Sequence, residues 1–202
     1  MTSTKNVQMK RAAIRRLEDP PVAQSLFGEV RWAWIWLIPR FYVGWEWFQE
    51  GWEKLNSPVW TGTITGFVNG ALTKTGGDHP DVQVWYAWFL DKVVLPNATV
   101  WSYLVSWGEL LVGIALILGI FTGIVAFFGS FMNMSYLLAG SVSINPILFT
   151  IAVLLVLAWK TAGWWGLDRW VLPALGTPWR PEVVFSEQKG DTQRLVQESG
   201  KA

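Results

Sequence analysis

Three long apolar runs dominate the second half of the chain. They cover residues 101–119, 122–140 and 145–165, and few charged side chains interrupt them. A helix needs about 20 apolar residues to cross a hydrocarbon layer about 30 Å thick, and each run is close to that length. The pattern therefore predicts three membrane-spanning helices, separated by a tight turn at Phe121-Thr122 and a short loop at 140–145.

A fourth predicted span, residues 31–54, precedes these runs and is apolar only in its first half. Pro39 is expected to kink it. At about 100° per residue, the charged positions of this span fall within an arc of about 140°, so they share one face. Glu50 and Lys54 are an i,i+4 pair in the favourable order. We expect the other spans to shield this polar face, whose members are Arg40, Glu46, Glu50, Glu53 and Lys54.

Residues 55–100 form a long connection between the first two spans. Its first part is rich in Gly and Thr, whereas segment 82–96 has apolar residues at helical spacing around Asp91 and Lys92. We expect this segment to be an amphipathic helix that lies on the membrane interface or dips into it. The predicted fold is all-α: an integral membrane four-helix bundle with an amphipathic helix in the long loop between spans 1 and 2.

The distribution of Lys and Arg predicts the orientation of the chain. Both terminal flanks are rich in these residues, the 140–145 loop has none, and the 55–100 loop has only Lys74 and Lys92. Positively charged flanks stay on the cytoplasmic side. This predicts a multi-pass protein of the cytoplasmic (inner) membrane, N-in and C-in, with the long loop extracytoplasmic. Its parts are a basic cytoplasmic tail (1–28), a membrane domain (29–176) and a flexible cytoplasmic tail (177–202).

The composition agrees with an integral membrane protein and excludes several kinds of functional site. Apolar residues make up 51% of the 202 residues, and 16 of them are Trp, a residue that favours membrane interfaces. A soluble protein with an aromatic core is disfavoured because the apolar runs are too long for ordinary core helices. A net charge of +1 gives no basic footprint for nucleic acid. With no Cys and only His79, we expect no haem, iron–sulfur cluster or metal in this chain alone.

Polar side chains inside the predicted spans are the candidate functional residues, because charge at membrane depth is costly. Counted at about 1.5 Å per residue, Glu46, Glu109 and Asn133 fall near one level of the bundle. Two carboxylates this close need a cation, and Arg40 and Lys54 are the available ones.

Three interpretations of these polar groups stay open. The groups form a structural network that pins the helices together, or a polar pocket that binds a quinone head group or relays protons. In the third interpretation some of them, Lys160 and Lys54 first, extend to the interface.

A series of short motifs includes the polar residues Arg40, Lys54, Glu109 and Asn133. In order and spacing these resemble the DoxX/DoxD-like membrane proteins, which include the small subunit of thiosulfate:quinone oxidoreductase, and the resemblance covers residues 31–176. The motifs are Arg40-x3-Gly44, Gly51-Trp-Glu-Lys54, Leu95-Pro96-Asn97-Ala98, Gly108-Glu109-Leu110, segments 116–123 and 129–141, Asn145-Pro146, and Gly166-Leu167-Asp168-Arg169.

The resemblance implies a four-helix membrane bundle and, in one branch of the family, quinone-linked sulfur oxidation together with a second, extracytoplasmic subunit. The first hypothesis is therefore a membrane subunit of a quinone-linked oxidoreductase, of the thiosulfate:quinone type. The candidate catalytic residues are Glu109, Glu46 and Arg40. The candidate quinone-binding residues are Arg40, Lys54, Asn133 and Tyr136.

The second hypothesis is a non-catalytic membrane scaffold or assembly subunit of a redox complex. It fits a chain without thiols or a nucleotide motif, and it makes the amphipathic segment a docking surface for a partner subunit. Both hypotheses leave open a protein partner or a homo-oligomer. A small-solute transporter is disfavoured, because the four spans show no obvious inverted repeat.

Overall fold

The computed structural model describes residues 19–177, and within that range the chain is entirely helical and has no β-strand, as predicted. The elements in chain order are α1 (Pro21–Gly28), η1 (Val30–Trp32), α2 (Ala33–Asn56), α3 (Trp60–Leu72), α4 (Val84–Phe89), η2 (Leu90–Val94), η3 (Leu95–Asn97), α5 (Ala98–Leu118), α6 (Thr122–Leu138), α7 (Asn145–Leu157) and α8 (Asp168–Ala174).

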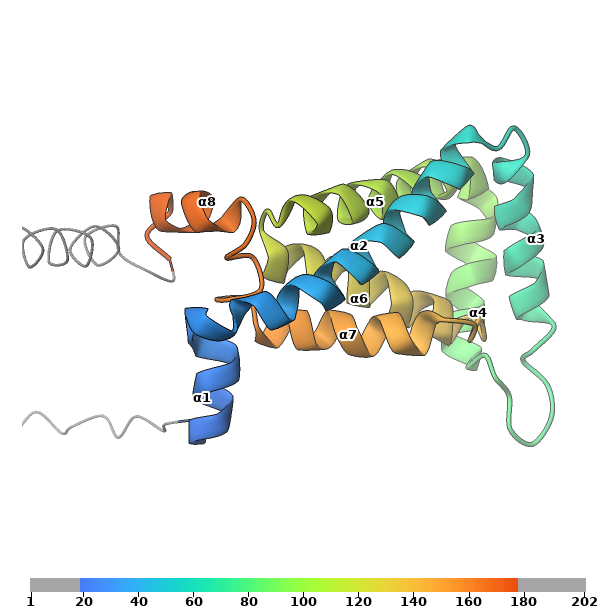
Figure 1. The fold of residues 1–202 in the computed structure, drawn as a ribbon. Helices are drawn as coiled ribbons and strands as arrows, with labels where there is room; N and C mark the ends of the chain where they lie inside the picture. Colours follow the sequence, from blue (N-terminus) through green and yellow to red (C-terminus); the bar gives the residue numbers. More distant parts are fainter. Residues whose placement is uncertain (1–18, 178–202) are drawn as a thin grey trace, which may run out of the picture.

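Four of these helices, α2, α5, α6 and α7, run side by side as one bundle (Figure 1). They lie close to the segments 31–54, 101–119, 122–140 and 145–165 that the sequence singles out. Their inward faces form an apolar core of Trp36, Val43, Trp47, Val112, Leu116, Ala126, Leu148 and Leu155, which Ala158 and Ala162 extend just beyond the end of α7.

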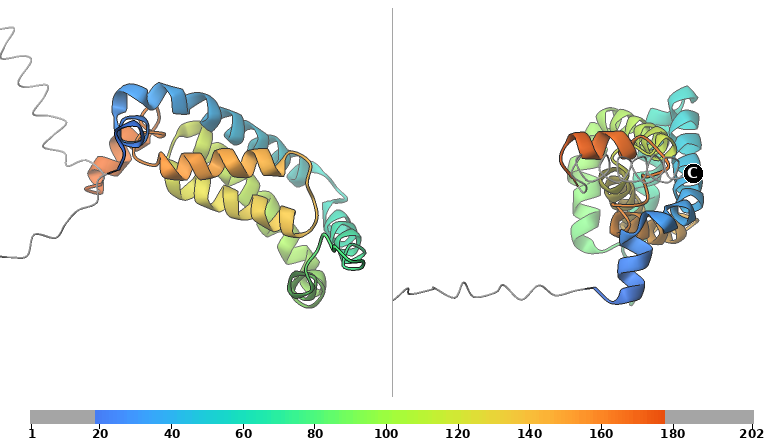
Figure 2. Two further views of the ribbon diagram at one scale, coloured as in Figure 1. Left: turned by 90° about the horizontal axis from the view of Figure 1, so that it is seen from below. Right: turned by 60° about the vertical axis from the view of Figure 1, so that its left-hand side comes forward.

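The remaining helices lie at the two ends of the bundle. In Figures 1 and 2, α1 and α8 are at one end, and α3 and α4 are at the other. We call these the α8 end and the α3 end. The helix α1 packs on α2, since Phe27 stacks on Trp36 and the Trp36 indole donates to the Leu26 carbonyl. Residues 1–18 of the predicted N-terminal tail and 178–202 of the C-terminal tail lie outside the described residues.

At the α3 end, the connection between the first two predicted spans contains one more helix than the sequence predicts. Its Gly/Thr-rich part forms the helix α3, which packs against the expected amphipathic helix in segment 84–97. Helical structure continues from there into α5, and Figure 1 shows the change of direction where Pro96 lies in η3. A second apolar core joins α3, this segment and the end of α6, and consists of Val68, Ala71, Val82, Tyr86, Leu90, Val94 and Ala139.

The lengths of the helices differ from the expected spans in two places. Among residues 19–177, one continuous helical stretch, Val84–Leu118, is long and apolar enough to cross a membrane, while α6 and α7 are shorter apolar helices. The fourth run was expected to be helical to residue 165, but α7 ends at Leu157. Single turns follow, such as the one closed by Thr161 N–H donating to the Ala158 carbonyl.

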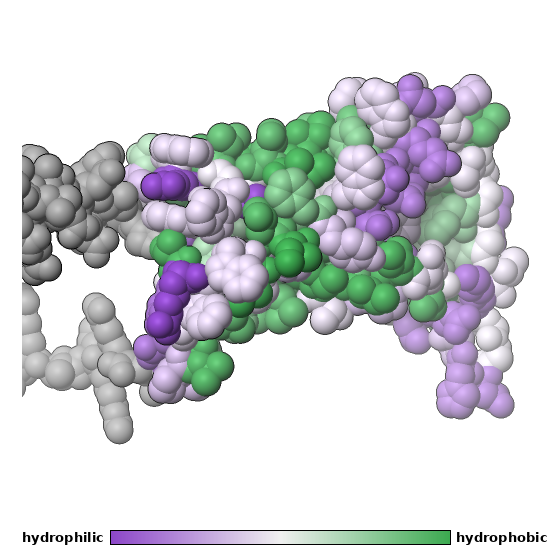
Figure 3. Space-filling view, in the orientation of Figure 1, coloured by the Kyte–Doolittle hydropathy of each residue, from purple (hydrophilic) through white to green (hydrophobic). Residues whose placement is uncertain are grey.

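The sides of the bundle expose many large apolar side chains. Figure 3 shows a hydrophobic band along the bundle between more polar ends. On α6 alone, Phe127, Phe128 and Phe131 have more than half of their surface exposed. Soluble monomers rarely expose apolar patches of this extent, whereas a lipid-facing surface requires them.

Glycines bring α2 and α5 into close contact. A Cβ atom placed on Gly51 of α2 would lie 2.8 Å from Leu110 Cα, and one on Gly113 of α5 would lie 2.6 Å from Phe48 Cα. Small residues permit such close helix approach where lipid supplies little hydrophobic driving force. This crossing fixes the facing side chains of α2 and α5 relative to each other, including Lys54 and Glu109.

Candidate functional site

The polar face of α5 begins the candidate site. Ser102, Ser106 and Glu109 are spaced i, i+4, i+7, so they share one side of the helix, and all three are buried. Ser106 Oγ donates to the Ser102 carbonyl at 2.8 Å, which satisfies the serine hydroxyl within the helix. The Glu109 carboxylate is longer and charged, so it needs partners from other helices.

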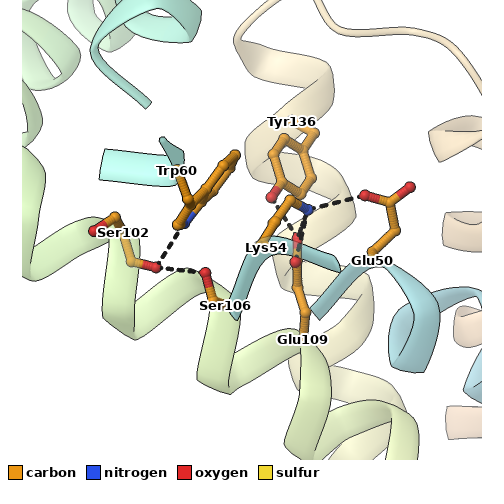
Figure 4. A network of polar contacts seen from close by, with 7 residues as sticks. All are labelled: Glu50, Lys54, Trp60, Ser102, Ser106, Glu109 and Tyr136. Carbon is orange, nitrogen blue, oxygen red and sulfur yellow. Dashed lines mark hydrogen bonds and ion pairs between the residues drawn. The ribbon is translucent and has the colours of Figure 1, made fainter. Parts of the chain in front are cut away.

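Lys54 and Tyr136 supply those partners (Figure 4). From α2, Lys54 Nζ lies 2.7 and 2.6 Å from the two oxygens of Glu109, and from α6, Tyr136 Oη donates to Glu109 Oε1 at 2.5 Å. The Glu109 side chain has no exposed surface and that of Lys54 is 14% exposed. Lys54 also binds Glu50 one turn earlier on α2, at 3.0 Å, and the Glu50 side chain is 58% exposed. The four groups form a continuous polar chain from the surface into the bundle.

A pocket of about 230 Å³ opens beside this chain at the α3 end. Lys54 lines it, and Trp60 at the start of α3 covers the ammonium, with the ring centroid 5.2 Å from Nζ. The Trp60 indole N–H donates to the Ser102 carbonyl at 3.0 Å, which holds the ring in place. The full lining is Lys54, Leu55, Ser57, Pro58, Trp60, Ser102, Tyr103 and Ser106.

Arg40 does not join this cluster, although the sequence placed it within reach of Glu109. It precedes Lys54 by 14 residues on α2, which is about 21 Å of helix. The buried guanidinium instead donates to the carbonyls of Ala162 and Trp165, at 2.9 and 3.1 Å, and faces Asp168. The depth of a residue along a helix does not reveal which loop folds back over the end of that helix. Here the loop after α7 supplies both carbonyl acceptors of Arg40.

Asp168 adds a second contact at the α8 end. Its two oxygens accept from the backbone N–H groups of Phe121 and Thr122, at 2.6 and 2.9 Å, at the N-terminus of α6. A carboxylate is favourable there because those N–H groups have no partner within the helix. Arg40 and Asp168 therefore form a structural connection among α2, α6 and the segment that follows α7.

The other predicted site residues, Glu46 and Asn133, differ in how deeply they are buried. Glu46 is half-buried on α2 and makes no hydrogen bond or ion pair with the described residues. Asn133 is fully buried on α6, and neither its amide nitrogen nor its amide oxygen has a partner within residues 19–177. The indole N–H of Trp47, which stacks on Tyr136, is also buried and unpartnered in this range. Thus Lys54, Glu109 and Tyr136 come together, with Asn133 one turn from Tyr136, while Arg40 and Glu46 do not.

Ser102, Ser106 and Trp60 line the pocket but were not predicted as site residues. The serines had a signal in the sequence, because their spacing places them on the same face of α5 as Glu109. Trp60 had none, since its position depends on α3, a helix that the residue pattern does not predict. Within the described part of the chain, no group of three or more His, Cys, Asp or Glu side chains is arranged to hold a metal ion.

The sequence model of the DoxX family matches residues 35–141, slightly more than half of the 202 residues. The matched region includes Lys54, Glu109 and Tyr136. No curated protein and no solved structure shows a significant match. The family match, together with the apolar exterior of the bundle, establishes that the chain belongs to the DoxX family of membrane proteins.

Proposed function

We propose that this protein is the membrane subunit of a quinone-linked oxidoreductase, and that the pocket beside Lys54 receives the quinone head group. The observation that carries the proposal is the Lys54–Glu109–Tyr136 cluster, in which Lys54 lines the pocket and Glu109 and Tyr136 lie behind it. Quinone chemistry needs a hydrogen-bond donor at the carbonyl oxygen and groups that move protons to it. Lys54 is the donor, and Glu109 and Tyr136 are the groups through which protons are exchanged.

The size and lining of the pocket support a ring-shaped head group. Its volume of about 230 Å³ is below the roughly 300–1,000 Å³ of sites that enclose drug-sized ligands, so it holds one ring and leaves an attached tail outside. Trp60 offers an aromatic face for stacking. Tyr103 is 58% exposed beside the lipid-facing surface of α5, which gives a tail a route into the bilayer.

The proposal includes a topology. We place α2, α5, α6 and α7 as four transmembrane spans in the cytoplasmic membrane, with both termini on one side because α1 and α8 lie at the same end of the bundle. The Lys- and Arg-rich flanks favour the cytoplasm as that side. The α3 end then faces the extracytoplasmic side. A membrane domain over residues 29–176 between cytoplasmic tails 1–28 and 177–202 is part of the same proposal.

The electron donor belongs to a partner in this scheme. Thiosulfate is the donor that the family resemblance suggests, and a partner subunit docked at the α3 end would oxidise it and pass electrons to the quinone. A homo-oligomer is the other assembly that fits.

Binding of decylubiquinone to the purified protein in nanodiscs tests the proposal. We expect it to raise the melting temperature of the wild type and of Lys92→Met, whose lysine is exposed and pairs only with the surface residue Asp91. We expect a much smaller increase in Lys54→Met and Ser106→Leu. Decanol, which has a similar tail and no head group, controls for partition into lipid. Equal shifts in all four proteins would contradict the assignment of the pocket.

A second candidate function is a non-catalytic scaffold. It is favoured by one observation: Trp85 and Trp88 on the outward face of α4 are each 61% exposed. In this alternative they dock a redox partner. Co-purification of a stable partner that is lost in Trp85→Ser/Trp88→Ser, together with absence of decylubiquinone binding, would favour the scaffold over the quinone subunit.

A further inference from the structure

The hydrogen bonds of Lys54 limit what the pocket can accept. An ammonium group has three N–H donors. Three acceptors surround Lys54 Nζ: both oxygens of Glu109 and one oxygen of Glu50, at 2.7, 2.6 and 3.0 Å. Lys54 therefore has no donor left for a ligand while all three contacts persist.

The two carboxylates are not equally easy to displace. Glu109 has no exposed surface, and its carboxylate would lose its cation in a dry interior if Lys54 turned away. Glu50 is 58% exposed, and water can replace the ammonium at its carboxylate. Because Glu50 does not line the pocket, a ligand that reaches Lys54 from there competes for the N–H group that Lys54 now donates to Glu50.

The charge around the pocket decides the class of that ligand. Two carboxylates surround a single ammonium, so the cluster carries one net negative charge when all three groups are ionised. Glu46 and Glu53 on the same half of α2 have no cationic partner among residues 19–177, and they add to the negative potential. An anion would meet repulsion here, whereas an uncharged acceptor needs only one N–H group.

We infer that the pocket admits an uncharged carbonyl acceptor that displaces Glu50 from Lys54, and that it excludes anions such as thiosulfate. The inference rests on the proposed function and makes it more specific: Glu50 is a displaceable competitor that sets the affinity for the head group. An anionic sulfur donor is then oxidised elsewhere, on the partner.

The test compares the wild type with Glu50→Gln and Glu53→Gln. The control residue, Glu53, is exposed on the same helix and has the same charge, but it makes no bond to Lys54. An exposed ion pair changes affinity by a small factor, so we expect the Kd for decylubiquinone in nanodiscs to fall about 2- to 5-fold in Glu50→Gln. The Kd of Glu53→Gln should equal that of the wild type. Thiosulfate should leave the melting temperature of the wild type where sodium chloride of equal ionic strength leaves it.

Each other outcome has a defined meaning. If decylubiquinone binds all three proteins with equal affinity, the proposed function stands and the displacement of Glu50 is wrong. If both variants bind more tightly by the same factor, a general charge effect replaces displacement. Stabilisation of the wild type by thiosulfate beyond the chloride control overturns the exclusion of anions. If decylubiquinone binds none of the three, the proposed function and this inference fail together.

Discussion

Glu109 combines a carboxylate without exposed surface with three short contacts from two other helices. The desolvation of such a group is offset only while its partners remain. The cluster therefore has two roles at the level of single residues. It connects α2, α5 and α6, and it places a donor at the wall of the pocket.

Removing only the cation of the Lys54–Glu109 pair should destabilise the protein more than neutralising both members of the pair. We expect Lys54→Met to lower the free energy of unfolding by about 3–5 kcal/mol, because Glu109 is left buried without a cation. The double variant Lys54→Met/Glu109→Gln should recover most of that loss, since no charge stays uncompensated. SDS-induced unfolding in mixed micelles measures both. A double variant less stable than Lys54→Met would refute the buried ion pair.

The hydroxyl of Tyr136 should have a smaller, measurable effect. Tyr136→Phe removes the hydrogen bond to Glu109 Oε1 and keeps the ring that stacks on Trp47. A hydrogen bond to a charged group contributes about 1.5–3 kcal/mol, and we expect a loss of that order in the same unfolding assay. Tyr42→Phe, at an exposed position on α2, is the matched control and should match the wild type. Equal effects of the two substitutions would contradict the role of the hydroxyl.

Part of this site could be predicted from the residues alone. Glu109 and Lys54 are candidates because charged groups at membrane depth need partners, and the two meet in the structure beside Tyr136, a candidate quinone-binding residue. Arg40 was assigned to the same cluster because only its level in the bundle could be estimated. Its true partners are backbone carbonyls of a loop more than 120 residues away, which carry no sequence signature.

At the scale of the elements, the pattern of apolar residues located the four bundle helices but not α3. Long apolar runs leave few alternatives to a helix in lipid. The segment that forms α3 contains Gly62, Gly66 and Gly70, and glycine disfavours a helix by about 1 kcal/mol per residue. Its helical structure depends on packing Val68 and Ala71 against the segment at 84–97, a tertiary contact that local propensity does not report.

Glycines on α5 and α3 should respond oppositely to the same substitution. Gly113→Ala places a methyl group against the backbone of Phe48 and should destabilise the protein by about 1–3 kcal/mol. Gly66→Ala meets no atom within 4 Å and should stabilise it by about 0.5–1 kcal/mol. The free energy of unfolding, measured for both variants, should decrease for Gly113→Ala and increase for Gly66→Ala. A neutral Gly113→Ala would show that α2 and α5 are not in close contact.

At the scale of the whole molecule, the two ends of the bundle differ in construction. The α8 end is closed by Arg40, Asp168 and their backbone partners, whereas the α3 end holds the pocket and the partly exposed polar chain. In the proposed function, ligand exchange and partner docking would therefore both take place at the α3 end.

Cysteine labelling tests the orientation, because the chain has no Cys of its own. His79 lies in the exposed loop at the α3 end, and Gln24 is exposed on α1 at the other end. A membrane-impermeant maleimide added to intact cells should label His79→Cys and leave Gln24→Cys unlabelled until the cells are lysed. Labelling of both positions in intact cells, or of Gln24→Cys alone, would exclude the N-in, C-in topology.

The position of Asp168 also has a consequence for synthesis. The residue that caps the start of α6 and the carbonyls that bind Arg40 all lie beyond residue 141, where the family match ends. A nascent chain that has produced α2, α5 and α6 thus carries a buried arginine without acceptors and an uncapped helix. These contacts can form only after the segment around residue 168 has been synthesised. We therefore expect a chain truncated at residue 141 to lack the acceptors of Arg40 and the carboxylate at the start of α6.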